Sequence, residues 1–172
     1  MPIYAIGDRS PSIDPRAFIH PDAVVIGDVT VGPESSVWPG TVLRGDHGAI
    51  RIGARTSVQD GAIVHCTAEL DTVIGDDCTV GHLAHLEGCT LESGSLVGSG
   101  ATVLHRAVVR TGALVAAAAL VPPGAEVPAG ALARGVPASI VEGGADPELL
   151  AHAMRTYVHN AHWYNAELRR ID

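Results

Sequence analysis

Two histidines and a glutamate lie within six residues of one another in the segment Val80–Cys89. They are His82, His85 and Glu87, and a further histidine, His65, lies upstream. Imidazole nitrogens and carboxylate oxygens are common ligands of zinc, so a short run of them on a rigid scaffold is a candidate metal site. Whether these side chains converge depends on the elements that carry them.

Those elements form a six-residue repeat. An aliphatic residue recurs at every sixth position, with a three-residue insertion after Leu43 and a second insertion around residues 67–72. A small or short residue follows four places after nearly every aliphatic one. A period of six fits neither an α-helix nor an isolated strand, so the unit must be a short strand and a turn. Three units make a triangular coil of about 18 residues, and stacked coils form a prism of three parallel sheets.

The repeat ends at residues 134–138, where glycine and proline stop further stacking. Asp146 is a suitable N-cap and Pro147 a suitable first residue for a following helix. Apolar residues then recur at spacings of four and three, so one face of this helix should lie along a sheet of the prism. These residues are Leu150, Met154, Tyr157, Ala161, Tyr164 and Leu168. We expect a β-helix domain over residues 1–145 and a C-terminal helix over residues 146–172.

Composition narrows the possible partners. The 172 residues suit one domain with a terminal appendage, and a core with only 3% aromatic residues must be built from aliphatic side chains. A net charge of -8 argues against nucleic acid or an anionic membrane as a partner. There is no apolar run near the ~20 residues of a transmembrane helix and no signal-peptide pattern, so a cytoplasmic protein is expected. Cys66, Cys78 and Cys89 follow no paired spacing and are expected to be reduced and structural.

The repeat register places polar residues in a column. Leu43, Val64 and Leu86 are three hexads apart when the insertions are left out, so they stack on one face with their side chains inward. The residues that follow them, and that therefore point outward, are Arg44, His65 and Glu87. His82 belongs to the preceding face, near a corner, and points away from this column.

A metal site needs three converging protein ligands and one open position. His65 and Glu87 can converge within one chain, whereas His82 cannot easily join them. His82 could instead reach the column of a neighbouring prism if three prisms pack around a threefold axis. The sequence therefore predicts an oligomer with sites between subunits. Trp38, which precedes the coil of Arg44, is expected in packing between subunits.

Several segments closely resemble those of γ-class carbonic anhydrases and their carbonic-anhydrase-like relatives. They are residues 38–46 (WPGTVLRGD), 58–61 (VQDG), 64–65 (VH), 81–82 (GH) and 135–138 (GVPA). The resemblance covers essentially the whole chain. It implies an all-β fold, a left-handed parallel β-helix with a C-terminal α-helix packed along it. It also implies a homotrimer with zinc, or iron, between subunits.

The resemblance also implies metal ligands. His65 matches a ligand from one chain and His82 the ligand from its neighbour. The family's third ligand is a histidine at the position of Glu87 here, and His85 would face the same side of an extended strand. Either His85 replaces the missing histidine, which we favour, or Glu87 ligates, or the site is degenerate. His105 is expected on the surface, within reach of the coil that carries Glu87.

Four further residues match catalytic positions of the family. Arg44 and Asp46 resemble its interface ion pair, and Gln59 and Asp60 resemble the residues that orient the metal-bound hydroxide. A bound zinc lowers the pKa of water to about 7, which would allow attack on carbon dioxide. His47 is the titratable candidate for carrying the proton away. The short loop at residues 68–71 offers little of the acidic loop found in the family's most active members, so turnover is expected to be low.

Three functions compete. The leading one is a zinc-dependent lyase that interconverts carbon dioxide and bicarbonate. A second is acyl transfer, because many hexapeptide-repeat proteins use acyl-CoA, although long loops are missing here and the arginines near the end are sparse. Those arginines are Arg106, Arg110 and Arg134. A third is a non-catalytic trimeric binding or scaffolding protein with a degenerate metal site, and Glu87 favours it.

Overall fold

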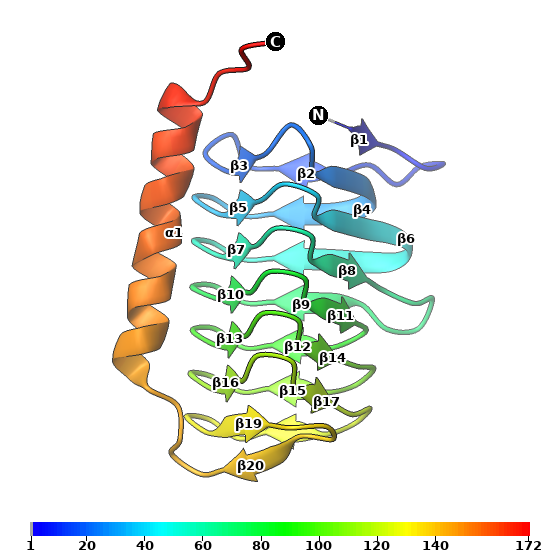
Figure 1. The fold of residues 1–172 in the computed structure, drawn as a ribbon. Helices are drawn as coiled ribbons and strands as arrows, with labels where there is room; N and C mark the ends of the chain where they lie inside the picture. Colours follow the sequence, from blue (N-terminus) through cyan, green and yellow to red (C-terminus); the bar gives the residue numbers. More distant parts are fainter. Residues whose placement is uncertain (1) are drawn as a thin grey trace.

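The computed structural model describes residues 2–172, and Met1, the first residue of the expected β-helix domain, lies outside them. The chain forms a parallel β-solenoid of about seven turns with one C-terminal helix, which confirms the predicted fold class (Figure 1). Short strands alternate with tight turns, and each coil pairs with the coils above and below it. Within the described residues, no helix has the length and apolarity needed to cross a lipid bilayer.

The first face of the prism is an eight-stranded sheet. Its strands are β3 (Phe18–Ile19), β5 (Ser36–Val37), β7 (Ser57–Val58), β10 (Thr79–Val80), β13 (Leu96–Val97), β16 (Leu114–Val115), β19 (Leu132–Arg134) and β20 (Ser139–Val141). All neighbours in this sheet are parallel except β19 and β20, which pair antiparallel. The chain therefore folds back at the last coil, where the solenoid ends.

The other two faces share one twelve-stranded sheet. It is continuous because β4 (Val24–Val31) and β6 (Val42–Ile52) each run around a corner of the prism. One face carries β1 (Ile3–Tyr4), β8 (Ile63–His65), β11 (His85–Glu87), β14 (Thr102–Val103) and β17 (Leu120–Val121), with β1 paired to the first part of β4. The other carries β2 (Ser12–Ile13), β9 (Thr72–Ile74), β12 (Thr90–Leu91), β15 (Val108–Val109) and β18 (Glu126–Val127), with β2 paired to the last residues of β4.

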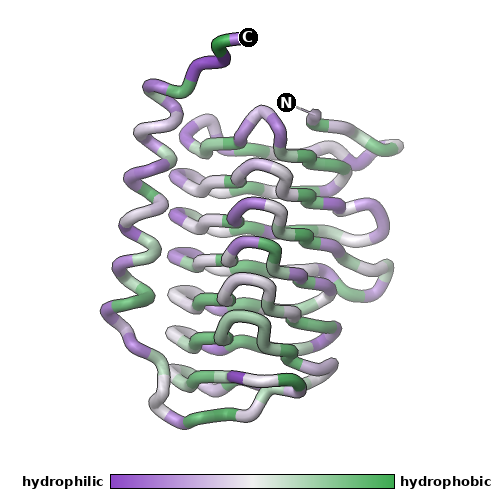
Figure 2. The backbone as a smooth tube through the Cα atoms, viewed as in Figure 1, coloured by the Kyte–Doolittle hydropathy of each residue, from purple (hydrophilic) through white to green (hydrophobic). Residues whose placement is uncertain are grey.

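One inward side chain per strand builds the core. Leu43, Val64 and Leu86 are paired in adjacent strands and are fully buried. Small residues such as Ala62 and Ala84 fill the corners and are also fully buried. Figure 2 shows hydrophobic residues recurring along every coil. The predicted six-residue pattern of inward aliphatic and corner residues is thus confirmed, and all three cysteines are buried and free.

Helix α1 (Pro147–Glu167) runs back along the eight-stranded sheet, so the C-terminus lies near the first coils (Figure 1). Its N-cap is Asp146, whose carboxylate accepts hydrogen bonds from the backbone N–H groups of Glu148 and Leu149. This is the predicted cap, because a carboxylate oxygen satisfies backbone donors that have no partner within the helix. Leu150 and Ala161 are buried beneath the helix.

Trp38 corrects one expectation. Its indole lies under α1, with its ring centroid 5.0 Å from that of Tyr164 and 5.3 Å from that of Phe18. The indole Nε1–H donates to the Ser36 hydroxyl at 2.9 Å, and only 5% of the residue is exposed. Trp38 therefore attaches the helix to its own prism and is not available to pack against another subunit.

We predict that Leu91→Ala lowers the free energy of unfolding by about 2–5 kcal/mol, because Leu91 is 1% exposed and truncation leaves a cavity between coils. The matched control is Leu149→Ala on α1, where the side chain is 49% exposed and the expected loss is below about 1 kcal/mol. Urea unfolding of both variants measures the difference. Equal losses would show that the aliphatic stack does not dominate stability.

Candidate metal centre

The predicted column of Arg44, His65 and Glu87 is present on the face of β8 and β11. Arg44 pairs with His65 across β6 and β8, and His65 pairs with Glu87 across β8 and β11. The residues before them point into the core, so alternation along each strand turns these three outward. The solenoid register therefore stacks a guanidinium, an imidazole and a carboxylate in consecutive coils.

His65 lies between two carboxylates. Its Nδ1 is 2.7 Å from Glu87 Oε1, and its Nε2 is 3.0 Å from Asp46 Oδ1. Arg44 forms an ion pair with the same Asp46 carboxylate. The contacts thus form one continuous charge network from Arg44 to Glu87.

Asp46 reaches this network because β6 contains extra residues at the corner. The pairing of β4 with β6 shifts register between Gly27 and Val29, which leaves residues 46–49 without partners in β4. Burial by itself raises the pKa of Asp46, but hydrogen bonds from Arg44 and His65 more than offset this effect, and the pKa is about 2. The carboxylate is therefore ionised throughout the physiological range.

Glu87 is approached by two further histidines. Its Oε2 is 3.5 Å from His85 Nε2 and 3.6 Å from His105 Nε2. The hydrogen bond from His65 is the main cause that lowers the pKa of Glu87, and burial opposes it. His85 thus faces the same side as Glu87, as predicted, and His105 comes closer to this carboxylate than the sequence indicated.

His82 lies in a separate group at the corner between two faces. Its Nδ1 is 2.9 Å from Asp60 Oδ2, and its Nε2 is 3.4 Å from the Tyr157 hydroxyl of α1. Gln59 precedes Asp60 in the same turn and is 5% exposed. The structure brings Asp60 and His82 into contact, with Gln59 next to Asp60 in the chain, but, as the repeat register predicted, does not place His82 in the column.

The donor types in both groups suit zinc or ferrous iron, since both metals bind imidazole and carboxylate. Within residues 2–172, however, no set of three His, Cys, Asp or Glu side chains is already arranged to hold a metal ion. Each group offers part of a coordination sphere. The chain therefore carries two incomplete half-sites: the face group of Arg44, Asp46, His65, His85 and Glu87, and the corner group of Gln59, Asp60 and His82.

The other residues that the sequence singled out lie outside both half-sites. His47 is exposed, and its backbone N–H donates to Asp46 at 2.9 Å. The Cys66 thiol is buried, and burial raises its pKa, so this residue is structural. Asp71 of the short loop at residues 68–71 accepts a hydrogen bond from the backbone of Ala49 at 2.7 Å. Tyr157 was expected only as part of the apolar helix stripe, and nothing in the helical spacing indicated its contact with His82.

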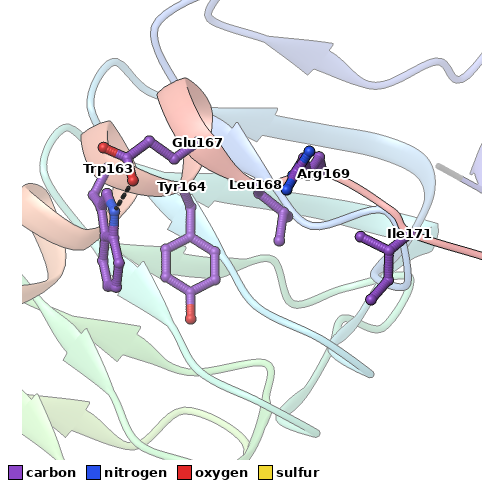
Figure 3. A pocket seen from close by; sticks show the side chains of 6 residues that line it. All are labelled: Trp163, Tyr164, Glu167, Leu168, Arg169 and Ile171. Atoms are coloured by element: carbon purple, nitrogen blue, oxygen red, sulfur yellow. Dashed lines mark hydrogen bonds between the residues drawn. The ribbon is translucent and has the colours of Figure 1, made fainter.

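A hollow of about 330 Å³ lies elsewhere, at the C-terminal end of α1 (Figure 3). Trp163, Tyr164, Glu167, Leu168, Arg169 and Ile171 line it. Leu168 was predicted to continue the buried helix stripe, but it follows the last helical residue and is 46% exposed. No residue of either half-site borders this hollow, so it is not part of the candidate metal centre.

Comparisons with known proteins agree with this architecture. Residues 10–45 and 71–105 match the bacterial transferase hexapeptide family (six repeats). Gamma carbonic anhydrase 2, mitochondrial, of Arabidopsis thaliana is 40% identical over 168 residues, which cover 93% of this chain. The chain spans 60% of the length of that relative. Carnitine operon protein CaiE of Escherichia coli K12 is 38% identical over 149 residues, covering 87% of this chain and 76% of CaiE.

A solved structure from Bacillus cereus, named as a candidate acetyltransferase, is 34% identical and superposes with a TM-score of 0.93. The match covers 95% of this chain and 96% of that one. Relatives named as carbonic anhydrases and relatives named as transferases therefore share this fold, and the chemistry must be argued from the site itself.

We predict a pH-dependent contribution of Asp46 to stability in metal-free protein with a chelator present. Because the folded pKa of about 2 lies below the ordinary 3.8, the stabilisation is complete above pH 4 and is lost as the pH falls toward 2. Allowing for solvent screening, Asp46→Asn should cost about 1–2 kcal/mol at pH 6 and about half of that at pH 3.

Urea unfolding of the wild type and of Asp46→Asn at both pH values measures this difference. The variant Asp8→Asn, which removes an exposed carboxylate away from the network, is the matched control. A cost for Asp46→Asn that stays constant between pH 6 and pH 3 would contradict the assigned ionic contacts.

Proposed function

This chain belongs to the γ-carbonic-anhydrase-like family of hexapeptide-repeat proteins. We propose that it hydrates carbon dioxide to bicarbonate, at metal sites between the subunits of a homotrimer. Family membership rests on relatives that match most of the chain.

The division into two half-sites is the observation that carries the proposal. Arg44, Asp46 and His65 form one continuous network on a face, while Asp60 and His82 form a separate pair at a corner. The family-like residues are therefore present and connected, yet they do not meet within one chain. Closed threefold packing supplies the missing half from a neighbour, because each subunit then offers its corner to the next subunit's face.

For the metal we propose His65 and His85 of one subunit and His82 of the next, with Glu87 as the alternative third ligand. The positions of His65 and His85 support this set, since both rings lie against the Glu87 carboxylate. The donor types fit zinc, with ferrous iron as the alternative. A divalent cation bound there supplies the Lewis acidity that makes water nucleophilic at neutral pH.

The remaining residues position the reacting groups. Asp46 stays ionised and holds His65 Nε2, and Arg44 holds Asp46, so the imidazole ring would keep its orientation while Nδ1 exchanged its contact with Glu87 for the metal. Gln59 and Asp60 lie beside His82 and would orient the attacking water toward carbon dioxide. His47 is exposed next to Asp46 and is the candidate proton carrier to solvent. Slow turnover follows if Asp71 remains bound to the backbone rather than exporting protons.

Acyl transfer is the second candidate, favoured by the 34% identical structure named as a candidate acetyltransferase. That chemistry needs cations for the phosphates of an acyl-CoA. Arg110 is paired with Glu92 at 2.7 Å and with Glu126 at 2.9 Å, so its charge is already neutralised within the chain. We therefore rank acyl transfer below carbon dioxide hydration and a non-catalytic scaffold third.

We predict that His65→Ala and His82→Ala each abolish carbon dioxide hydration, while a mixed assembly of the two variants recovers part of it. In a randomly mixed trimer, one interface pairs an intact His65 with an intact His82, which gives about a quarter of wild-type activity over the whole population. Stopped-flow hydration assays after co-refolding measure this recovery. His152→Ala, on the exposed side of α1, is the control and should keep full activity.

Native mass spectrometry establishes that mixed trimers have formed. If mixed trimers are present and remain as inactive as the single variants, the site is not shared between subunits. Full activity of His82→Ala alone would count against the same claim.

A further inference from the structure

The Glu87 carboxylate is the meeting point of three histidines from one chain. Its Oε1 accepts the hydrogen bond from His65 at 2.7 Å. Its Oε2 faces His85 Nε2 at 3.5 Å and His105 Nε2 at 3.6 Å. One oxygen is thus satisfied by a short hydrogen bond, and the other lies between two imidazole nitrogens without a close contact to either.

The distances from Glu87 Oε2 to the two imidazole nitrogens suit a shared metal ion better than direct hydrogen bonds. Donor–acceptor separations of 3.5–3.6 Å lie beyond the usual hydrogen-bond range of about 2.7–3.2 Å. They are close to the separation of about 3.3 Å between neighbouring ligand atoms around a tetrahedral zinc with bonds of about 2.0–2.1 Å. Each imidazole nitrogen therefore lies from Glu87 Oε2 at nearly the separation of two ligands of one ion, and beyond the usual range of a hydrogen bond.

His105 adds an independent observation. Its Nε2 atom is buried and has no hydrogen-bond partner among the described residues. A buried polar nitrogen is normally satisfied, and one left without a partner that faces a carboxylate points to an absent ligand. A cation between His105 Nε2 and Glu87 Oε2 would satisfy both atoms.

Local packing holds two members of this set in position. The His65 hydrogen bond fixes the Glu87 carboxylate, in the way that outer contacts orient metal-ligating carboxylates. Gly88 lies against the His105 ring, since a Cβ atom added at Gly88 would be 3.1 Å from His105 Cδ2 and 3.0 Å from Leu70 Cβ. The absence of a side chain at position 88 lets the His105 ring approach β11.

We propose that His85, Glu87 and His105 bind a divalent cation within a single chain. The three groups are not yet closed around an ion, because no set of three ligand side chains in residues 2–172 is prearranged as a metal site. Closure requires the two imidazole rings to turn toward each other around Glu87 Oε2. This set shares His85 and Glu87 with the centre proposed between subunits and replaces the neighbour's His82 by His105.

Cobalt(II) is the probe, because it replaces zinc in nitrogen–oxygen sites and its visible absorption reports coordination geometry. Tag-free wild type, His82→Ala, His105→Ala and the double variant are compared by equilibrium dialysis and absorption spectroscopy, with His152→Ala as the control. We expect His82→Ala to keep about one cobalt per chain with a four-coordinate spectrum. The double variant should bind at least about tenfold more weakly.

Two results would overturn the in-chain site: loss of cobalt binding in His82→Ala alone, or equal binding by His82→Ala and the double variant. His105→Gln and a thermal melt for each variant distinguish loss of a ligand from loss of folding. The outcome is separable from the activity proposed above. Full carbon dioxide hydration by His82→Ala refutes the shared centre whatever its cobalt content. Retained cobalt in His82→Ala supports the in-chain site, and loss of hydration in the same variant supports the separate role of His82 in the shared centre.

Discussion

The register between coils determines where every other group in this protein can lie. Each strand places one aliphatic side chain, such as Leu43, Val64 or Leu86, into a core that excludes water completely at those positions. A slip of one residue would turn the whole aliphatic set to solvent, so burial fixes the pairing. Because Arg44, His65 and Glu87 follow the buried residues, the same burial fixes their outward column.

A rigid register also explains why the candidate site is divided. The corner that carries His82 and Asp60 cannot turn toward the face of His65 without breaking the ladder between coils. The neighbouring chain can supply what the fold keeps apart, and this is the physical reason to place a metal between subunits. Glu87 then has a second role, as a ligand of the proposed in-chain cation site, because its carboxylate lies within 3.6 Å of His65, His85 and His105 of its own chain.

Sequence periodicity predicted the strands, the outward column and the Asp146 helix cap, because each depends on local spacing and burial. It could not place Asp46 against His65, since that contact depends on a corner bulge whose direction is set by neighbouring coils. Trp38 was misplaced for a similar reason: two of its aromatic partners, Tyr157 and Tyr164, lie on a helix more than a hundred residues away. The contact of His105 with Glu87 depends on turn geometry and on the space left at Gly88.

The metal centre is proposed to form between subunits, from the face of one and the corner of the next. Anomalous X-ray diffraction from zinc-loaded crystals, recorded above and below the zinc edge, locates the metal relative to both. We expect a zinc peak about 2.0–2.1 Å from His65 of one subunit and from His82 of its neighbour. A zinc ion bound to His65 without any residue from a neighbouring subunit, or none at His65, would contradict it.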